Sequence, residues 1–340
     1  GYLALSALNV KAGYIDFSQD VHYGDQALYD KWMNGNELHE GQVLFTTEAP
    51  MGNVAQVPDN KRYILSQRTI AFDVKEDIIT ENFLATLLRS PAIFNTLTSI
   101  SSGGTAKGVS QKSLAGVDIH IPTDLREQTL LADYFHSLDH LITLHQRKCE
   151  DTKKLKKYML QKMFPQNGSK VPEIRFKGFT DDWEQRKLED VVEFLDTMRK
   201  PLEGAKRISG PYPYYGASGI VDYVDGYLFD EELVLLSEDG ANITDRNYPV
   251  CFLASGKYWV NNHAHVLKTK DGNENNFICN SLERKDYKQY NSGMAMPKLN
   301  QEVCRGIPIS CPSFDEQKKI GDYFRNLDHF ITLHQRECSI

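Results

Sequence analysis

The stretch DYFHSLDHLITLHQRKC, from Asp133 to Cys149, occurs again as DYFRNLDHFITLHQREC, from Asp322 to Cys338. Thirteen of the seventeen positions are identical, and the two copies are 189 residues apart. A repeat with so long a period indicates two copies of one structural unit. Because both copies lack proline and glycine and carry apolar residues at helical spacing, each predicts a helix.

The first copy lies in a longer proline- and glycine-free stretch, from about residue 124 to 164. A helix of about forty residues spans roughly 60 Å, which favours a partner helix. The second copy, from about residue 315 to 340, supplies one. We predict an intramolecular coiled-coil pair, with an antiparallel arrangement as one option. Its seam is a seven-residue ladder with companions three residues later: Leu131, Leu138, His145 and Met159 with Tyr134, Leu141 and Leu155, and Ile320, Leu327 and His334 with Tyr323 and Phe330.

Two polar residues, His145 and His334, occupy this predicted seam in both copies. Polar seam residues commonly set the register of a coiled coil. We therefore interpret both as register-setting or hydrogen-bonded core histidines rather than metal ligands.

Composition describes a soluble globular protein: 340 residues, 41% hydrophobic and 25% charged, enough for two domains. No apolar run is long enough to cross a membrane, and no secretory signal precedes the chain, so a cytoplasmic location is expected. The six cysteines form no CxxC pair, which predicts free, mostly packed thiols in a reducing compartment.

The net charge of −7 and the pI near 5.8 argue at first against a nucleic-acid partner. The positive charge is, however, concentrated in two groups, for which a solvated helix face is an equally good explanation. These groups are Arg147, Lys148, Lys153, Lys154, Lys156, Lys157 and Lys162, and then Arg199, Lys200, Lys206 and Arg207.

Strand-like segments precede each helix, and a linker rich in Pro, Gly and small polar residues separates the two halves. The expected strands cover 42–46, 64–74, 233–236 and 250–253, with a short helix at 81–88. The predicted fold is α+β, with a pseudo-twofold internal repeat. Its parts are a first strand-rich domain (1–123), a central helix (124–165), a linker (166–172), a second strand-rich domain (173–312) and a distal helix (313–340).

The two strand-rich domains show the same layout in divergent sequence. Val43-Leu-Phe-Thr-Thr-Glu48 parallels Leu233-Val-Leu-Leu-Ser-Glu238, and Ser102-Gly103 parallels Ser292-Gly293. Ile119-His-Ile-Pro122 likewise parallels Ile309-Ser-Cys-Pro312. Scaffold positions therefore recur while loop residues differ.

The order of these features resembles the specificity subunit of type I restriction–modification systems. The features are a strand-rich insert, then SG, IxIP, EQ and ADYFxxLDxxIxLHQRK, a linker, and EIRFKGFTDDWEQRKL from Glu173 to Leu188. The resemblance covers essentially the whole chain. The chain departs from the family pattern in two ways. The first strand-rich domain lacks about forty residues that would correspond to the segment after Pro172. The second helix lacks a counterpart of residues 151–164. The chain also starts at Gly1 without Met and stops within a helix-like pattern, so it is expected to be a fragment or a trimmed version of a longer chain.

The resemblance implies two target-recognition domains, each reading one half of a bipartite double-stranded DNA site, with the two helices as a spacer. It also implies a non-catalytic subunit without a cofactor. Two methyltransferase subunits would dock on the helices, and restriction subunits would join through the complex.

Enzyme signatures are weak or missing in the sequence. A methyltransferase would need a Gly-rich cofactor loop and an Asn/Asp-Pro-Pro-aromatic motif, and a translocase a phosphate-binding loop, and none is present. Pro58-Asp59 with Asp73-Val-Lys75 fits a loose nuclease pattern but is better explained as a turn. His263-Ala-His265 has no cysteine or carboxylate at metal-ligand spacing. The tyrosines at 212, 214 and 215 are more typical of a core than of a stacking platform.

Base recognition needs Arg, Lys, Asn, Gln, Ser or Thr in loops that reach the groove edges. The candidates in the first domain are Thr47, Asn53, Lys61, Arg62, Gln67, Arg68 and Lys107. Those in the second domain are Asn242, Thr244, Arg246, Asn247, Lys257, Asn262 and Lys298. Partner-binding candidates are the repeated Gln146, Arg147, Gln335 and Arg336. The competing hypothesis is a coiled-coil adaptor that assembles proteins without binding DNA.

Overall fold

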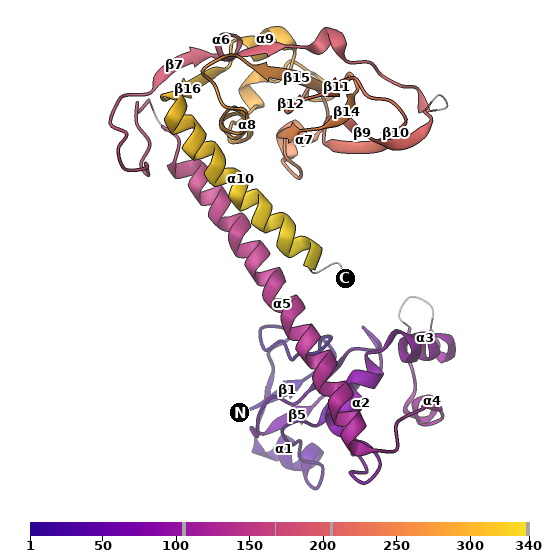
Figure 1. The fold of residues 1–340 in the computed structure, drawn as a ribbon. Coiled ribbons are helices and arrows are strands. Elements are labelled where there is room, and N and C mark those ends of the chain that lie inside the picture. Colours follow the sequence, from indigo (N-terminus) through magenta and orange to yellow (C-terminus); the bar gives the residue numbers. More distant parts are fainter. Residues whose placement is uncertain (104–106, 167, 205–206, 338–340) are drawn as a thin grey trace. The chain divides into compact units, whose positions relative to one another are not determined.

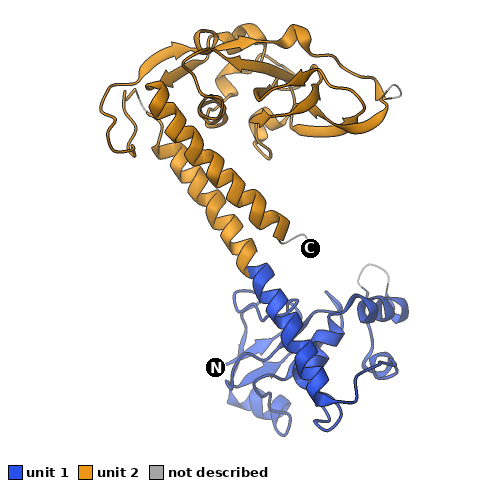
Figure 2. Cartoon of the chain, viewed as in Figure 1, with its two compact units in different colours: residues 1–143 blue, residues 144–340 orange. Residues whose placement is uncertain are grey.

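The structure, a computed structural model, describes residues 1–103, 107–166, 168–204 and 207–337. Three residues named above therefore lie outside the described residues: Asn167 of the predicted linker, Lys206 of the second basic group, and Cys338. The chain divides into two compact units, residues 1–143 and 144–340 (Figure 2). None of the helices in the described ranges is both long and apolar enough to cross a membrane.

Unit 1 combines two small sheets with helices (Figure 1). The first sheet has the order β2-β1-β5 and the second β4-β3-β6. The strands are β1 (Tyr2–Leu5), β2 (Tyr23–Gly24), β3 (Val43–Thr46), β4 (Val54–Gln56), β5 (Tyr63–Leu65) and β6 (Thr69–Ala71). The helices are α1 (Gln26–Met33), α2 (Glu81–Leu88), α3 (Pro91–Ile100), α4 (Gln111–Ala115) and the first part of α5 (Leu125–Lys162).

Unit 2 has two sheets with an additional strand each and a third sheet of two strands. Its sheets have the orders β10-β9-β14-β11, β13-β12-β15-β8 and β16-β7. The strands are β7 (Glu184–Lys187), β8 (Val192–Phe194), β9 (Ser209–Gly216), β10 (Gly219–Val224), β11 (Phe229–Asp230), β12 (Leu233–Ser237), β13 (Cys251–Ala254), β14 (Lys257–Val260), β15 (Ala264–Thr269) and β16 (Pro308–Cys311). The helices are the second part of α5, α6 (Leu188–Val191), α7 (Asn242–Asp245), α8 (Asn275–Glu283), α9 (Gln301–Arg305) and α10 (Phe314–Glu337).

A glutamine at the same position of each repeat attaches the repeated helix to its unit. Gln128 of α5 accepts a hydrogen bond from Thr80 N (3.0 Å) at the start of α2 and donates to Pro122 O (2.8 Å). Gln317 of α10 accepts from Glu274 N (3.1 Å) at the start of α8 and donates to Pro312 O (3.1 Å). Both side chains are buried. Because these bonds satisfy main-chain groups at helix ends, they fix each repeated helix on its domain.

The helix pair of unit 2 is antiparallel, as the contacts along α5 and α10 run in opposite order. Nδ1 of His145 lies 3.0 Å from Nδ1 of His334, and Lys156 Nζ lies 2.6 Å from Asp328 Oδ1. The end of α5 packs in one core with α8 and α10, which includes Phe164 and Phe324. The predicted helices are thus confirmed, and so is the position of both histidines on the seam between them.

Of the predicted companions of the ladder, Tyr323 is half-buried and packs against the core of unit 2, and the others are wrong. Companions were expected three residues after the ladder positions, yet Tyr134, Leu141, Leu155 and Phe330 are exposed. In unit 2, three residues that lie four positions after a ladder residue are buried instead: Cys149, Met163 and Phe324. Both spacings fit a helix of 3.6 residues per turn, and the sequence did not show which side faces the partner.

Two further expectations were incomplete. The run 64–74 forms two strands, β5 and β6, in different sheets, because Arg68 has a φ of +66° and turns the chain between them. The predicted helix at 81–88 is confirmed as α2, whereas α1, α3 and α8 were not expected. The five cysteines that the structure describes are free and buried, as predicted.

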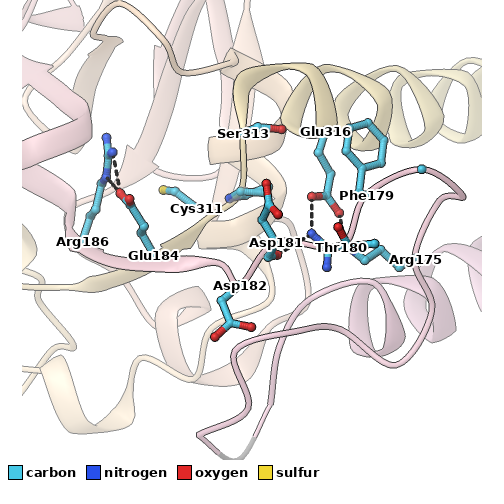
Figure 3. Close-up of a pocket in the computed structure, with 12 residues that line it drawn as sticks. Arg175, Phe179, Thr180, Asp181, Asp182, Glu184, Arg186, Cys311, Ser313 and Glu316 are labelled. Carbon is cyan, nitrogen blue, oxygen red and sulfur yellow. Dashed lines mark hydrogen bonds and ion pairs between the residues drawn. The ribbon is translucent and has the colours of Figure 1, made fainter.

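The EIRFKGFTDDWEQRKL segment packs against the start of α10 (Figure 3). Nε and Nη2 of Arg175 each lie 2.8 Å from an oxygen of Glu316, whose side chain is buried. Both side chains line a cavity of about 300 Å³, together with Asp181, Glu184 and Arg186. A buried bidentate ion pair fixes the orientation of both side chains, so this segment is tied to α10 by specific geometry.

Candidate nucleic-acid interface

At one end of the β3 sheet in unit 1, three loops form the surface that we call the unit 1 edge, of which the structure describes residues 47–52, 66–68, 101–103 and 107–108. Thr47 N donates to Arg68 O (2.8 Å), and Val109 N donates to Thr47 O (2.9 Å). Glu48 forms a bridge with Gly108, next to the exposed Lys107. The structure therefore brings together four predicted residues: Thr47, Gln67, Arg68 and Lys107.

Unit 2 has a corresponding surface, the unit 2 edge, formed by residues 238–245, 261–263 and 292–298. Glu238 N donates to His263 O (2.9 Å), and Leu299 N donates to Glu238 O (2.7 Å). Asp239 forms a bridge with Lys298, and Gly240 N donates to Pro297 O (3.0 Å). Asn262 and Lys298 lie at this edge, and α7, which carries Asn242 and Thr244, follows directly after Gly240.

These hydrogen bonds align the two edges residue by residue. Thr46 pairs with Thr69, and Ser237 pairs with Ala264 in the same way. Thr47 therefore corresponds to Glu238. The sequence parallel had matched Glu48 with Glu238, which is wrong by one residue. Relative to its partner strand β15, β12 begins one residue earlier than β3 does relative to β6. The match of Ser102 with Ser292 is confirmed, since these residues donate to Gly108 O and Lys298 O respectively, each at 2.9 Å. At Gly293 an added Cβ would lie 1.8 Å from Met296 O, so this loop requires glycine.

Charge at the unit 2 edge is organised by a partly buried network. Arg199 Nη1 lies 2.6 Å and Lys298 Nζ 3.3 Å from Glu238, and His265 Nδ1 lies 2.6 Å from Asp196. Burial lowers the pKa of His265, but the hydrogen bonds and charges of Asp196 and Cys304 together outweigh this effect and raise the pKa to about 10. Burial raises the pKa of Asp196, but His265, the Val266 N–H and Arg199 together outweigh this effect and hold the pKa below its ordinary value. Both groups are therefore charged at neutral pH.

Unit 1 has no equivalent of this network at the positions that the alignment matches. Thr47 and Gly108 replace Glu238 and Lys298, and the recorded ion pair is an exposed one between Arg68 Nε and Glu48 (3.5 Å). The two edges thus share their main-chain frame and differ in their polar side chains.

Several predicted residues lie away from the edges. Asn53 donates to Val10 O (2.8 Å) and serves the fold. Lys61 and Arg62 precede β5, and Lys257 begins β14, at the opposite ends of these strands from Gln67 and Asn262. Arg62 and Lys257 each lie over an aromatic ring, that of Tyr29 and Tyr227 respectively.

Two more candidates face the helix pair instead of the unit 2 edge. Arg246 Nη2 lies 2.9 Å from Glu283, and Arg246 and Asn247 line a cavity of about 890 Å³. Lys153, Lys156 and Lys157 of α5 line the same cavity. Asn242 and Thr244 satisfy their own loop: Asn242 donates to Tyr248 O (2.9 Å) and Thr244 to Ala241 O (3.0 Å).

The family model described as "Type I restriction modification DNA specificity domain" matches residues 17–153 and again residues 180–339. The chain belongs to this family. Specificity subunits of this family are non-catalytic parts of type I restriction–modification systems.

Two curated relatives and one solved structure illustrate the relationship. A Haemophilus influenzae protein named as a type I restriction enzyme specificity subunit is 36% identical over 144 residues, 42% of this chain. The Methanocaldococcus jannaschii MjaVIII specificity subunit is 24% identical over 88% of this chain. The chain spans 36% of the first relative's length and 75% of the second's. The S subunit structure from M. genitalium, at 15% identity, covers 89% of this chain and 80% of its own with a TM-score of 0.68, and supports the fold.

The partner-binding candidates of this family member lie on the surface of its helix pair. Gln146 and Arg147 on α5 and Gln335 and Arg336 on α10 are exposed. Leu144 and its repeat counterpart Leu333 are also exposed, by 37% and 40%. Because residues three apart are neighbours on a helix, each leucine lies beside the arginine of its own copy.

Sequence reasoning missed the apolar part of the unit 2 edge. Met294 and Met296, in the loop that follows Ser292-Gly293, are fully and 60% exposed. His263, whose Nδ1 lies 2.9 Å from Asp239, was considered only as a metal ligand. The Ser-Gly parallel was the available signal, because it marked the whole following loop as part of the variable surface. Asp59 interacts with Lys61 and Tyr63 in a turn between β4 and β5, as predicted.

Proposed function

We propose that this chain reads a bipartite double-stranded DNA target, with one half-site for each unit. The observation that carries the proposal is the equivalence of the two edges: one main-chain frame presents different polar side chains. Gln67 corresponds to Asn262, Arg68 to His263 and Thr47 to Glu238. Base edges are distinguished by such donors and acceptors, so two different sets select two different half-sites.

The roles follow from side-chain chemistry. Gln67 and Asn262 suit adenine, Arg68 suits guanine, and Lys107 and Lys298 suit phosphate groups. Thr47, Asn242 and Thr244 position their loops, and so does Asn53. Lys61, Arg62, Lys257, Arg246 and Asn247 are proposed as outer phosphate contacts. The target-recognition domains are proposed as residues 1–123 and 173–312, with residues 124–165 and 313–340 as spacer helices.

We further propose that two methyltransferase subunits bind the duplicated helix surface, and that restriction subunits join through them. Polar helix positions drift easily between copies, yet Gln146-Arg147 recurs as Gln335-Arg336. An exposed leucine accompanies each arginine with nearly the same exposure. A surface that combines a repeated apolar residue with a repeated arginine is typical of a protein interface.

The R147E/R336E double variant tests this assignment. Because both charges are reversed on an exposed surface, partner subunits should be lost before the fold is. Light scattering measures the mass of the reconstituted complex, and circular dichroism checks folding. K153E/K154E on the same α5 helix is the matched control. A complex with both partners despite R147E/R336E would refute the assignment.

Methylome mapping of cells that express the chain with its methyltransferase tests DNA recognition. A bipartite motif is expected, and replacing residues 173–312 by another such domain should change one half-site only. Simultaneous change of both half-sites would contradict one unit per half-site. The coiled-coil adaptor hypothesis instead predicts no motif and no salt-dependent binding to duplex DNA.

A further inference from the structure

The two copies of the repeated helix meet at one pair of equivalent residues. His145 and His334 are separated by 189 residues, the period of the repeat, and their Nδ1 atoms lie 3.0 Å apart. A residue that contacts its own repeat counterpart lies at the pseudo-twofold axis relating α5 to α10. Both side chains are only partly exposed, by 23% and 15%.

A carboxylate joins the histidines at this axis. Oε2 of Glu337 lies 2.5 Å from Nδ1 of His145 and 3.3 Å from Nδ1 of His334. The three side chains form a group of potential metal ligands. Two imidazole nitrogens and one carboxylate oxygen are ligands typical of Zn²⁺ and other borderline divalent cations.

We propose that His145, His334 and Glu337 bind one divalent cation of the Zn²⁺ class, which links α5 to α10. Ligand atoms at about 2.0–2.2 Å from a tetrahedral zinc ion are about 3.3 Å apart. The three ligand atoms here are 3.0, 2.5 and 3.3 Å apart. Binding therefore requires shifts of less than about 1 Å, and the partly exposed Glu337 gives the ion access from solvent.

Hydrogen bonding alone satisfies this group incompletely. Nδ1 of His145 lies within 3.0 Å of two other acceptor-capable atoms, Nδ1 of His334 and Oε2 of Glu337. A ring nitrogen carries at most one proton, so it cannot donate fully to both neighbours. A cation between the three atoms accepts a lone pair from each of them. The sequence favoured hydrogen-bonded histidines, and the carboxylate is what the structure adds.

The repeat is asymmetric at the position that supplies this carboxylate. Glu337 follows His334 by three residues, whereas Lys148 follows His145 by three. This is one of only four differences among the seventeen repeated positions. The axis therefore has one acidic ligand, and the lysine opposite it provides a matched control within the same chain.

Zinc titration of the full chain tests the proposal. Metal-free protein competes with a chromogenic chelator under reducing conditions, and the H145Q/H334Q variant measures the background from six cysteines and the other histidines. The wild type should bind one more ion than H145Q/H334Q. E337Q should bind at least about tenfold more weakly, K148Q should match the wild type, and K148E should bind more tightly.

Stability gives a second readout. Zn²⁺ should raise the Tm of the wild type and leave that of H145Q/H334Q unchanged, because only a folded site gains from binding. Circular dichroism of each variant without metal confirms that the helices persist. Equal stoichiometry and affinity in the wild type and H145Q/H334Q would overturn the proposal. A thiolate charge-transfer band with Co²⁺ would overturn it too, because cysteine would then be the ligand. The test is independent of DNA recognition.

Discussion

The two units attach their repeated helices by equivalent hydrogen bonds, but they bury equivalent helix residues to different extents. Gln128 and Gln317 make equivalent buried hydrogen bonds. Yet Phe135 is 46% exposed, whereas its repeat counterpart Phe324 is fully buried. In unit 2 the ring of Phe164 packs 6.1 Å from that of Phe324. The same helix residue therefore contributes differently to the free energy of unfolding in each copy, because its burial depends on neighbouring elements and not on the helix itself.

The edges differ in a second way. In unit 2 a chain of buried and half-buried charges connects His265, Asp196, Arg199 and Glu238. In unit 1 the pair of Arg68 and Glu48 is exposed. Arg199 and Lys298 are therefore held in place beside Glu238, whereas Arg68 is freer to reorient toward a base. This difference predicts a more rigid edge in unit 2.

The largest expected effect compares Phe324→Ala with Phe135→Ala. Loss of a fully buried phenylalanine should cost about 3–5 kcal/mol. Loss of the half-exposed one should cost less than about 1 kcal/mol. Urea unfolding of the purified chain measures both, and hydrogen exchange assigns the loss to a unit. Equal costs would show that burial of the two copies does not differ in solution.

Asp196→Ala should destabilise unit 2 by about 3–5 kcal/mol, because it leaves His265 buried without its partner. Glu48→Ala is the control at the exposed pair of unit 1, with an expected cost below about 1 kcal/mol. Unit-resolved hydrogen exchange measures both variants.

The pH dependence of the same pair has a defined sign. His265 has a raised pKa in the folded state, so its stabilisation is complete below its ordinary pKa of about 6.5 and is lost as the pH rises through about 10. Asp196 has a lowered pKa, so its stabilisation is lost at acidic pH. The free energy of unfolding of unit 2 should therefore fall between pH 7 and pH 10, and less so in His265→Gln. An identical pH profile in that variant would contradict the role of His265.

Helices and repeats were predictable from the sequence because periodicity and duplication are visible in it. The turn at Arg68 was not, because a positive φ in a residue other than glycine leaves no trace in residue type. The loop residues were ambiguous for a chemical reason. Asn53 and Asn242 bond to nearby main-chain oxygens with the same amide that would read a base. Residue type therefore predicted candidates, and only the fold separated edge residues from loop-forming ones.

Gln128→Ala and Gln317→Ala should each cost about 1–3 kcal/mol, since main-chain groups lose their buried partners. The effect of Gln128→Ala should be the larger, because Gln128 donates at 2.8 Å to both Ile78 O and Pro122 O. Gln146→Ala, at an exposed position of α5, serves as the control. Unfolding monitored separately in the two units measures the comparison. If only one of the two variants lost stability, the two glutamines would not have equivalent roles.

The smallest effects concern base recognition at equivalent positions of the two edges. Gln67→Ala and Asn262→Ala should each relax one base position in one half-site, at about 1–3 kcal/mol of discrimination, and leave the other half-site unchanged. Lys107→Ala should instead weaken binding to all sequences and reduce the salt dependence of binding by about one ion. Methylome mapping of each variant with its methyltransferase measures the relaxed position. Because Gln67 and Asn262 lie at the same place in the frame, the relaxed positions should be equidistant from the unspecified gap. If both variants relaxed the same half-site, the two equivalent positions would not read different half-sites. That result would refute the equivalence of the edges.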